Sequence, residues 1–278
     1  MKCKFTKMEG AGNDYIYVYT PLSPVPDPAT ASKVWSRKHF GIGSDGLILI
    51  DKSHTPEADF TMRMFNNDGT EGMMCGNGIR CVAKYVYDHR LTDKKKVAID
   101  TLSGIKVIDV HTDENDMVKT ATVDMGTPAL RDKRLMDTPD GGMVDGLVNG
   151  RKGTFVSMGN PHFVIFVPDV NKVDIEHEGR QLETDPIFPK RCNIEFATIR
   201  PDGSIRMRVW ERGSGITMAC GTGACATAVA ACVNNLCGRQ CTIEMDGGTL
   251  HTEWREDNGH LLMTGPATTV FEGEIDLP

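Results

Sequence analysis

The sequence lacks the features that mark several large classes of protein. Its 278 residues carry a formal net charge of −7, and no basic block exceeds Lys94-Lys95-Lys96, so we expect no nucleic-acid partner. No apolar run approaches the length of a membrane span, and the first residues do not have the pattern of a signal or transit peptide. Rossmann and P-loop fingerprints are also missing. These absences favour a soluble, cytoplasmic globular protein with no membrane partner.

Regular cysteine spacing is missing as well. The chain has nine cysteines, an odd number. No Cys-x-x-Cys surrounds Cys75 or Cys220, which disfavours a thiol redox protein. Cys237 and Cys241 could begin a zinc site, but no second ligand pair accompanies them. In a reducing cytosol we expect free thiols, most of them small core residues, and no metal.

One cysteine-containing stretch occurs twice. Residues 62–78 align without gaps on residues 207–223, and in both a cysteine stands before a Gly-x-Gly turn: Cys75-Gly76-Asn77-Gly78 and Cys220-Gly221-Thr222-Gly223. A helical pattern follows each turn. Such self-similarity predicts two equivalent structural units. If the units pack about a pseudo-twofold axis, the two cysteines can face each other across one cleft.

Each repeated cysteine is predicted to lie at a helix N-terminus. Unpaired N–H groups and the positive end of the helix dipole favour a thiolate there, and they can also bind a substrate carboxylate. One Cys-Gly-x-Gly alone is a weak signal, because a cysteine before a helix is usually a packed core residue. Two equivalent copies favour catalysis. A disulfide between Cys75 and Cys220 remains the alternative, as an inactive oxidised form.

The distribution of strand and helix patterns predicts a mixed α/β (α+β) fold of two pseudo-symmetric halves. Several strands in each half surround a helix of small or apolar residues, which predicts a barrel-like, mostly antiparallel sheet around a central helix. We place the first half at residues 1–120 with the tail 266–278, and the second half at residues 121–265. Helices are expected at residues 29–39 and 169–183.

Two facing thiols suit proton transfer with inversion at carbon. A base must remove the proton from one face while an acid supplies a proton to the other. A thiolate and a thiol can exchange these roles, because the ordinary pKa of cysteine is about 8.5. Converging helix N-termini would stabilise the intermediate carbanion. No lysine for pyridoxal phosphate can be picked out. The repeat therefore predicts a cofactor-independent racemase or epimerase.

The assembled motifs resemble those of the diaminopimelate epimerase family. They are Gly10-Ala11-Gly12-Asn13-Asp14, Gly41-Ile42-Gly43-Ser44-Asp45-Gly46, Phe65-Asn66-Asn67-Asp68-Gly69, Gly159-Asn160-Pro161-His162 and both cysteine loops. They come in family order over nearly the whole chain. The resemblance implies an isomerase that interconverts LL- and meso-diaminopimelate without a cofactor, in lysine and peptidoglycan-precursor synthesis. It also implies a homodimer.

The resemblance assigns roles to individual residues. Cys75 and Cys220 match the acid/base pair, and His162 and Glu211 match residues that tune the pKa of the thiols. The residues that match substrate contacts are Asn13, Asn66, Gly76, Asn77, Asn160, Asn193, Glu211, Arg212, Gly221 and Thr222. Gly46 stands where some members carry Gln, so no side-chain contact is assigned there. Ser214 and Ile216 also depart from the family's loop, without removing a catalytic group.

Other functions remain as alternatives. A proline or hydroxyproline racemase would share the fold and the paired thiols, but the Cys-Gly-Asn-Gly and Glu-Arg-Gly loops argue against it. A phenazine-type isomerase is disfavoured because such proteins lack the two cysteines. A non-catalytic amino-acid binder would tolerate Cys75→Ser without functional loss.

Overall fold

The computed structural model describes residues 2–278 and divides the chain into two compact units. Unit 1 comprises residues 1–124 and 264–278, and unit 2 comprises residues 125–263. The sequence placed these boundaries at 120/121 and 265/266. The first difference arises because strand β8 (Val118–Asp124) continues to the end of the unit. In the described residues no helix is long and apolar enough to cross a membrane.

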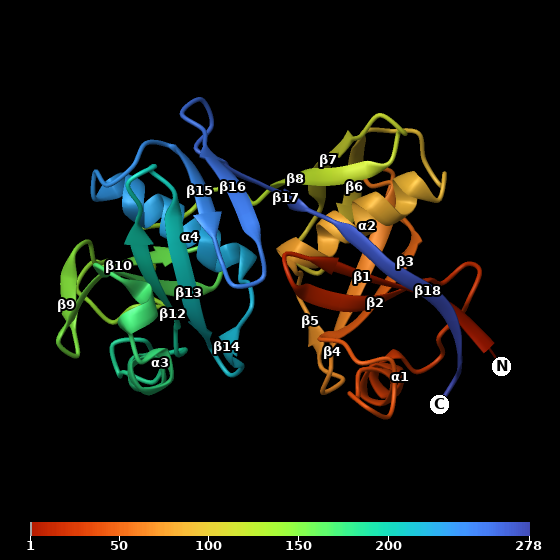
Figure 1. The fold of residues 1–278 in the computed structure, drawn as a ribbon, viewed down its shortest axis with the longest axis horizontal. Coiled ribbons are helices and arrows are strands. Elements are labelled where there is room, and N and C mark those ends of the chain that lie inside the picture. The colour runs from red at the N-terminus through yellow and green to blue at the C-terminus, as the bar shows by residue number, and fades with distance from the viewer. Residues whose placement is uncertain (1) are drawn as a thin grey trace. The chain divides into compact units, whose positions relative to one another are not determined.

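Unit 1 is a curved, mostly antiparallel sheet around one long helix (Figure 1). Along the sheet the strands are paired in the order β18-β1-β2-β3-β4-β6-β7-β8. Among these pairs of the described residues, β2–β3 and β4–β6 are parallel and the others antiparallel. The elements are β1 (Lys2–Gly10), β2 (Asn13–Tyr19), α1 (Pro28–Trp35), β3 (Gly46–Lys52), β4 (Phe60–Asn66), β5 (Glu71–Gly72), α2 (Gly76–Asp88), β6 (Lys96–Asp100), β7 (Lys106–Thr112), β8 and β18 (Thr268–Asp276).

Unit 2 repeats this plan. Strand β10 pairs antiparallel with β11, β11 parallel with β12, β12 antiparallel with β13, β13 parallel with β15, and β15 antiparallel with β16. The elements are β9 (Gly146–Val148), β10 (Arg151–Ser157), β11 (Pro161–Phe166), η1 (Val170–Lys172), α3 (Ile175–Glu183), β12 (Asn193–Ile199), β13 (Ile205–Glu211), β14 (Gly215–Thr217), α4 (Gly221–Val233), β15 (Gln240–Glu244), β16 (Thr249–Trp254) and β17 (Leu261–Pro266), the last continuing into unit 1.

The long helix of each unit is buried against the inner face of its sheet. Helix α4 contacts β10, β11, β12, β13, β15 and β16. Its alanines, Cys225 and Thr227 are buried and fit this close packing because they add little bulk and no charge. Helix α2 packs on β1, β2, β7 and β8, and carries two buried cations. Lys84 pairs with Asp88 at 2.6 Å, while the Arg80 side chain donates to backbone carbonyls.

The outer face of each sheet is covered by the shorter helix. Helix α1 packs on β3 and β4, where Trp35 is buried beside Leu47 and Phe65. Helix α3 packs on β12 and β13, where Leu182 lies in a cluster with Phe196 and Trp210. Both faces of the central strands are therefore covered, which explains the unbroken apolar run of β3.

The structure confirms the mixed α/β fold class and corrects two helix boundaries. The helix expected at residues 29–39 ends at Trp35, because the chain turns through Ser36 and reaches a positive φ of 68° at His39. The helix expected at residues 169–183 is two elements, η1 and α3. Asp169 and Asp174 each accept a backbone N–H bond and so cap separate segments.

Candidate active site

Cys75 caps helix α2 of unit 1. It is the residue before the helix, with an extended backbone (φ −125°, ψ 119°), and its Sγ accepts a bond from the Gly78 N–H at 3.3 Å. The Sγ also lies 3.1 Å from Asn13 Oδ1, which can accept the thiol proton. A partly exposed sulfur thus has an N–H donor on the helix side and an amide acceptor on the β2 side.

Asn13 is held by a carboxylate. Its Nδ2 donates to Asp45 Oδ2 at 2.6 Å, and the Asp14 N–H donates to the same oxygen at 3.1 Å. Burial and the nearby Asp14 raise the pKa of Asp45. Tyr15 is also beside the sulfur, and burial together with the charges of Cys75 and Asp45 raises the pKa of its hydroxyl well above the usual value. The orientation of the Asn13 amide is therefore fixed by its neighbours.

The other predicted residues of unit 1 lie at the ends of β4 and α2. Asn66 ends β4, and its Nδ2 donates to Thr70 Oγ1 at 3.0 Å. Gly76 and Asn77 form the first helical positions, where backbone N–H groups have no partner within the helix. Asn77 is only 2% exposed, and its Oδ1 has no hydrogen-bond partner among residues 2–278.

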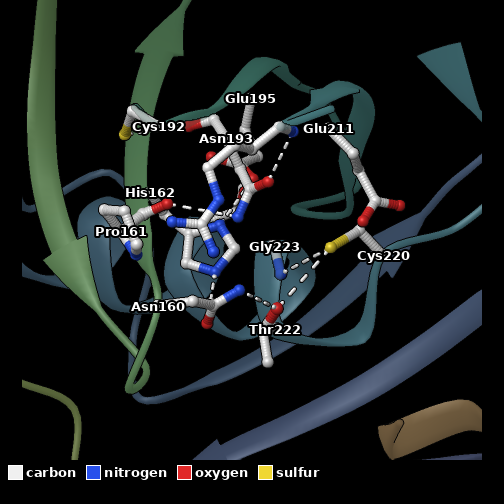
Figure 2. Close-up of polar contacts among 12 residues, drawn as sticks. Asn160, Pro161, His162, Cys192, Asn193, Glu195, Glu211, Cys220, Thr222 and Gly223 are labelled. Carbon is white, nitrogen blue, oxygen red and sulfur yellow. Dashed lines mark hydrogen bonds and ion pairs between the residues drawn. The ribbon is translucent and has the colours of Figure 1, made fainter. Parts of the chain in front are cut away.

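Cys220 caps helix α4 with almost the same geometry (Figure 2). Its backbone is extended (φ −126°, ψ 110°) and its Sγ accepts from the Gly223 N–H at 3.4 Å. The Thr222 hydroxyl lies 3.6 Å from the same sulfur. Cys220 is 7% exposed and more buried than Cys75. Gly221 and Thr222 occupy the positions that Gly76 and Asn77 occupy in unit 1.

A chain of polar side chains leads from the sheet of unit 2 to this sulfur (Figure 2). Glu195 Oε1 lies 2.7 Å from His162 Nδ1, and His162 Nε2 lies 3.1 Å from Asn160 Oδ1. Asn160 Nδ2 then donates to Thr222 Oγ1 at 3.3 Å. His162 and Glu195 are fully buried, which makes their partnership obligatory, since an unpaired buried polar group is costly. The chain ends at the hydroxyl beside Cys220.

Two carboxylates influence the Cys220 thiol. Burial raises its pKa well above the usual value, and the charges of Glu211 and Glu195 raise it further. The Thr222 hydroxyl and the Gly223 N–H act in the opposite direction, because they donate to the thiolate. The pKa of Glu211 is itself raised by burial, against hydrogen bonds from Thr217 and Cys220.

The loop that carries Glu211 and Arg212 is held by hydrogen bonds to two other segments of the chain. The Arg212 N–H donates to Asn193 Oδ1 at 2.9 Å, and Asn193 Nδ2 donates to the Pro161 carbonyl at 3.2 Å. The Arg212 guanidinium donates to the Lys190 carbonyl at 2.9 Å.

Buried Glu183 holds the far side of the same loop. It accepts bonds from Trp210 Nε1 at 2.7 Å and from the Gly213 N–H at 2.8 Å, and it pairs with Arg191. These contacts hold the loop that carries Arg212.

Within each unit the structure brings some of the predicted residues together. Unit 1 groups Asn13 with Cys75 near the start of α2, and unit 2 groups Asn160, His162, Glu211 and Thr222 around Cys220. The sequence did not single out four supporting residues, namely Tyr15, Asp45, Glu183 and Glu195. Aligning the halves strand by strand would have revealed Glu195, because it occupies the position that apolar Ile48 occupies in unit 1. No group of three His, Cys, Asp or Glu side chains within residues 2–278 could hold a metal ion.

Solved structures identify the class of fold. A hydroxyproline epimerase from Agrobacterium vitis superposes with a TM-score of 0.72 at 11% identity, covering 99% of this chain and 92% of that one. A phenazine biosynthesis protein from Bacillus anthracis gives the same score at 15% identity and covers 99% of both chains. At such identities the likeness shows the fold alone. The class is the two-unit, diaminopimelate epimerase-like fold.

Sequence comparison then identifies the family. The family model described as diaminopimelate epimerase matches residues 5–130 and 154–270. A diaminopimelate epimerase from Phocaeicola vulgatus is 58% identical over 278 residues, covering 99% of this chain and 98% of that protein. One from Methanococcus maripaludis is 48% identical, covering 99% of this chain and all of that protein. The chain belongs to the diaminopimelate epimerase family, which confirms the resemblance found in the motifs.

Proposed function

We propose that the protein interconverts LL-2,6-diaminopimelate and meso-diaminopimelate by moving the α-proton between two thiols, Cys75 and Cys220. The observation that carries this proposal is the repeated cap: in each unit one cysteine sulfur lies at the N-terminus of a buried helix. Family membership supplies the substrate class. The reaction is an isomerisation in which one stereocentre is inverted and no atom is gained or lost.

The two thiols would act on opposite faces of the α-carbon. One thiolate removes the α-proton, and the other thiol delivers its proton to the opposite face. After one turnover the protonation states of Cys75 and Cys220 are exchanged, so the reverse reaction uses the same groups in the opposite roles. Proton transfer by positioned groups of this kind contributes about 10²- to 10⁴-fold to a rate.

The helix N-termini would stabilise the carbanion. The first N–H groups of α2, at Gly76 and Asn77, and of α4, at Gly221 and Thr222, can donate to the carboxylate of the reacting centre. The negative charge that develops on this carboxylate in the transition state then lies near the positive ends of the helix dipoles. The backbone therefore supplies the stabilisation for which other racemases use a bound cofactor, and we propose that no pyridoxal phosphate is needed.

The polar side chains would bind the remainder of the substrate. Arg212 can bind a carboxylate through its planar fork. Asn13, Asn66 and Asn160 can donate to carboxylate or accept from ammonium. Both ends of the Asn193 side chain are already bonded within the protein, so we propose that it contributes mainly by holding Arg212. Glu211 and His162 would tune the pKa of Cys220.

We also propose the cellular setting. Diaminopimelate stereoisomers serve lysine and peptidoglycan-precursor synthesis, so the protein would act in the reducing cytoplasm, where its free thiols are maintained. A homodimer is proposed from the family resemblance alone.

The decisive test is proton exchange in deuterated water. Reduced protein without added cofactor is incubated with LL-diaminopimelate and, separately, with L-proline. Deuterium at the α-position of diaminopimelate, with growth of the meso form, would support the proposal. Exchange into proline alone would reassign the protein to the racemases that share its fold. No exchange into either compound would favour an amino-acid binder.

A further inference from the structure

Glu195 marks a chemical difference between the two cysteine sites. In the sheet of unit 2 it pairs with Val164 and Val209, and in unit 1 Ile48 pairs with Tyr17 and Met64 in the same register. Both residues are fully buried. A carboxylate therefore occupies in one unit the place that an apolar side chain occupies in the other.

Both side chains lie directly beneath the cysteine turn. A Cβ added to Gly78 would meet Ile48 Cδ1 at 2.7 Å, and a Cβ added to Gly223 would meet Glu195 Oε1 at 2.7 Å. That second position is also 3.3 Å from the Cys220 Sγ, so Oε1 and the sulfur are at most about 6 Å apart. The carboxylate is thus close enough to act on the thiol through the low-dielectric interior.

The hydrogen bonds around Glu195 are directional. Asn160 directs its Nδ2 to Thr222, so its Oδ1 faces His162 Nε2, and that nitrogen must therefore carry a proton. A single further proton lies between His162 Nδ1 and Glu195 Oε1. The other oxygen, Oε2, is buried without a hydrogen-bond partner among residues 2–278. With both protons counted, the His162–Glu195 pair is neutral as a whole; its carboxyl end lies beneath the cysteine turn and its imidazole end lies toward Asn160.

We propose that Glu195 is a positioning residue that makes the two thiols unequal, by fixing the proton of His162 and by placing the carboxyl end of the His162–Glu195 pair beneath Cys220. The inference rests on the proposed function, in which Cys220 exchanges its proton with the substrate. The charged and titratable groups that face Cys220 are Glu195 from β12, Glu211 from β13 and, through Asn160 and Thr222, His162 from β11. Burial is the largest cause of the raised pKa of Cys220, and the nearby carboxylates of Glu211 and Glu195 act in the same direction, because negative charge favours retention of the thiol proton.

The test compares thiol titrations in Glu195→Gln and in the parent protein. Iodoacetamide alkylation is followed between about pH 6 and pH 10.5, and fragment-resolved mass spectrometry reports each cysteine separately. We expect the apparent pKa of Cys220 to fall by about one pH unit or more in the variant. Cys75 serves as the internal reference. Exposed Glu176→Gln, in the same unit, is the matched control and should leave both titrations unchanged.

An unchanged or raised apparent pKa of Cys220, or an equal shift at Cys75, would overturn the inference. Glu195→Ile provides a second variant, because isoleucine fills the equivalent place in unit 1, and the same fall is expected from it. Neither titration uses substrate. Failure of this inference is therefore separate from failure of the deuterium-exchange test.

A different observation concerns the two cysteines that follow helix α4. Cys237 lies in the connection to β15, and Cys241 lies within that strand. Their sulfurs are 2.8 Å apart, closer than two unbonded sulfurs normally pack and not far above the roughly 2.05 Å of a disulfide. Cys237 is partly exposed, whereas Cys241 is 6% exposed. One residue of the pair is thus partly exposed and the other is buried.

We infer that Cys237 and Cys241 form a site of reversible oxidation by low-molecular-weight disulfides. The Cys237 thiolate attacks the disulfide and releases one small thiol, which leaves a mixed disulfide on Cys237. The Cys241 thiolate then attacks the Cys237 sulfur and releases the second small thiol. Two protein thiols are oxidised and one small disulfide is reduced to two thiols. The hydrogen bond from Cys241 lowers the pKa of Cys237, which suits the attacking role.

The test treats the reduced full chain with oxidised glutathione and maps the product with trypsin. Cleavage at Arg239 separates the two cysteines, so their disulfide joins two peptides. We expect this linked species in the parent protein, and persistent glutathionylation of Cys237 in Cys241→Ser. Reduction by dithiothreitol should reverse both. A stable glutathione adduct on Cys237 in the parent protein, or no oxidation at either cysteine, would refute the inference.

Discussion

The two cysteine sites share a backbone and differ in what surrounds it. Cys75 and Cys220 have nearly equal dihedral angles and accept N–H bonds of 3.3 and 3.4 Å from the third residue of their turns. The Cys-Gly-x-Gly turn itself therefore sets the position of the sulfur at the helix N-terminus. It occurs at both places where the turn meets a buried helix.

The surroundings determine what each sulfur does. Cys75 is partly exposed and faces the Asn13 amide, above an apolar Ile48. Cys220 is more buried and has two carboxylates and a threonine hydroxyl near it. Moving a proton between two thiols does not require that their surroundings differ at equilibrium. Under the proposed function one sulfur must carry the proton when substrate arrives, and the surroundings of Cys220 favour that sulfur as the carrier.

The largest expected effect comes from removing either sulfur, and the two variants should differ in the stereocentre whose proton they exchange. Cys75→Ala and Cys220→Ala should each lower epimerisation by at least about 10³-fold, because either the base or the acid is lost. Each variant keeps one thiol, which can exchange only the α-proton on its own face. In deuterated water we therefore expect one variant to exchange LL-diaminopimelate and the other to exchange the meso centre of opposite configuration.

Circular dichroism and thermal unfolding would serve as controls for folding of these variants. Near-full turnover by either variant would contradict the two-thiol mechanism. Exchange of the same stereocentre by both would show that the thiols do not serve opposite faces.

The next effect comes from adding one methyl group to each turn. In Gly223→Ala the new carbon meets Glu195 Oε1, which is held by His162, and it also presses on the Cys220 sulfur. In Gly78→Ala it meets the terminal carbon of Ile48, which can rotate away. We expect a loss of about 100-fold in kcat/KM and 1–3 kcal/mol of stability for the first change, and distinctly less for the second.

Urea unfolding and steady-state kinetics on the pair would measure this difference. Equal losses in the two variants would show that the carboxylate beneath Cys220 is as mobile as the isoleucine beneath Cys75.

Much of this organisation was readable from the sequence because it depends on local patterns. The Cys-Gly-x-Gly turns predicted two capped helices, and the small residues of 224–233 predicted a helix buried inside a sheet. Helix ends were predicted less well. At residues 29–39 and 169–183 the end depends on single capping side chains and on a left-handed residue, which periodicity does not register.

The supporting residues could not be found from local patterns. Glu183 reaches the Gly213 N–H across 30 residues of chain, and Glu195 reaches His162 across 33. Such contacts are created by strand register, since one residue of slip would turn Glu195 away from the helix. The sequence contains the carboxylates, but only the pairing of β11, β12 and β13 places them beneath Cys220.

A smaller effect is expected from the contacts that hold the loop after β4 in unit 1 and the loop after β13 in unit 2. In unit 2 Glu183 accepts from Trp210 and Gly213, and in unit 1 the Ser32 hydroxyl donates to the carbonyls of Phe65 and Asn66. Glu183→Ala leaves buried donors unpaired and loosens Arg212, so we expect KM for diaminopimelate to rise about tenfold with a smaller change in kcat.

The comparison variant Ser32→Ala removes only one hydroxyl and should change KM less than threefold. Such a change in KM corresponds to about half a kcal/mol of binding free energy. A fall in kcat without a rise in KM for Glu183→Ala would mean that the loop acts on the chemical step rather than on binding.

The smallest expected effect concerns the hydroxyl beside Cys220. The Thr222 hydrogen bond lowers the pKa of Cys220 against the opposing effects of burial and the two carboxylates. Thr222→Val preserves the shape of the side chain and removes the donor, so the thiolate becomes less stable and the pKa of Cys220 rises further. At a fixed pH below that pKa, iodoacetamide should then alkylate Cys220 a few-fold more slowly, whereas Cys75, which has no such hydroxyl in its turn, should react as before. Faster alkylation of Cys220 would mean that the hydroxyl accepts a bond from the thiol instead of donating one, which its second lone pair allows while Asn160 Nδ2 still donates to the same oxygen.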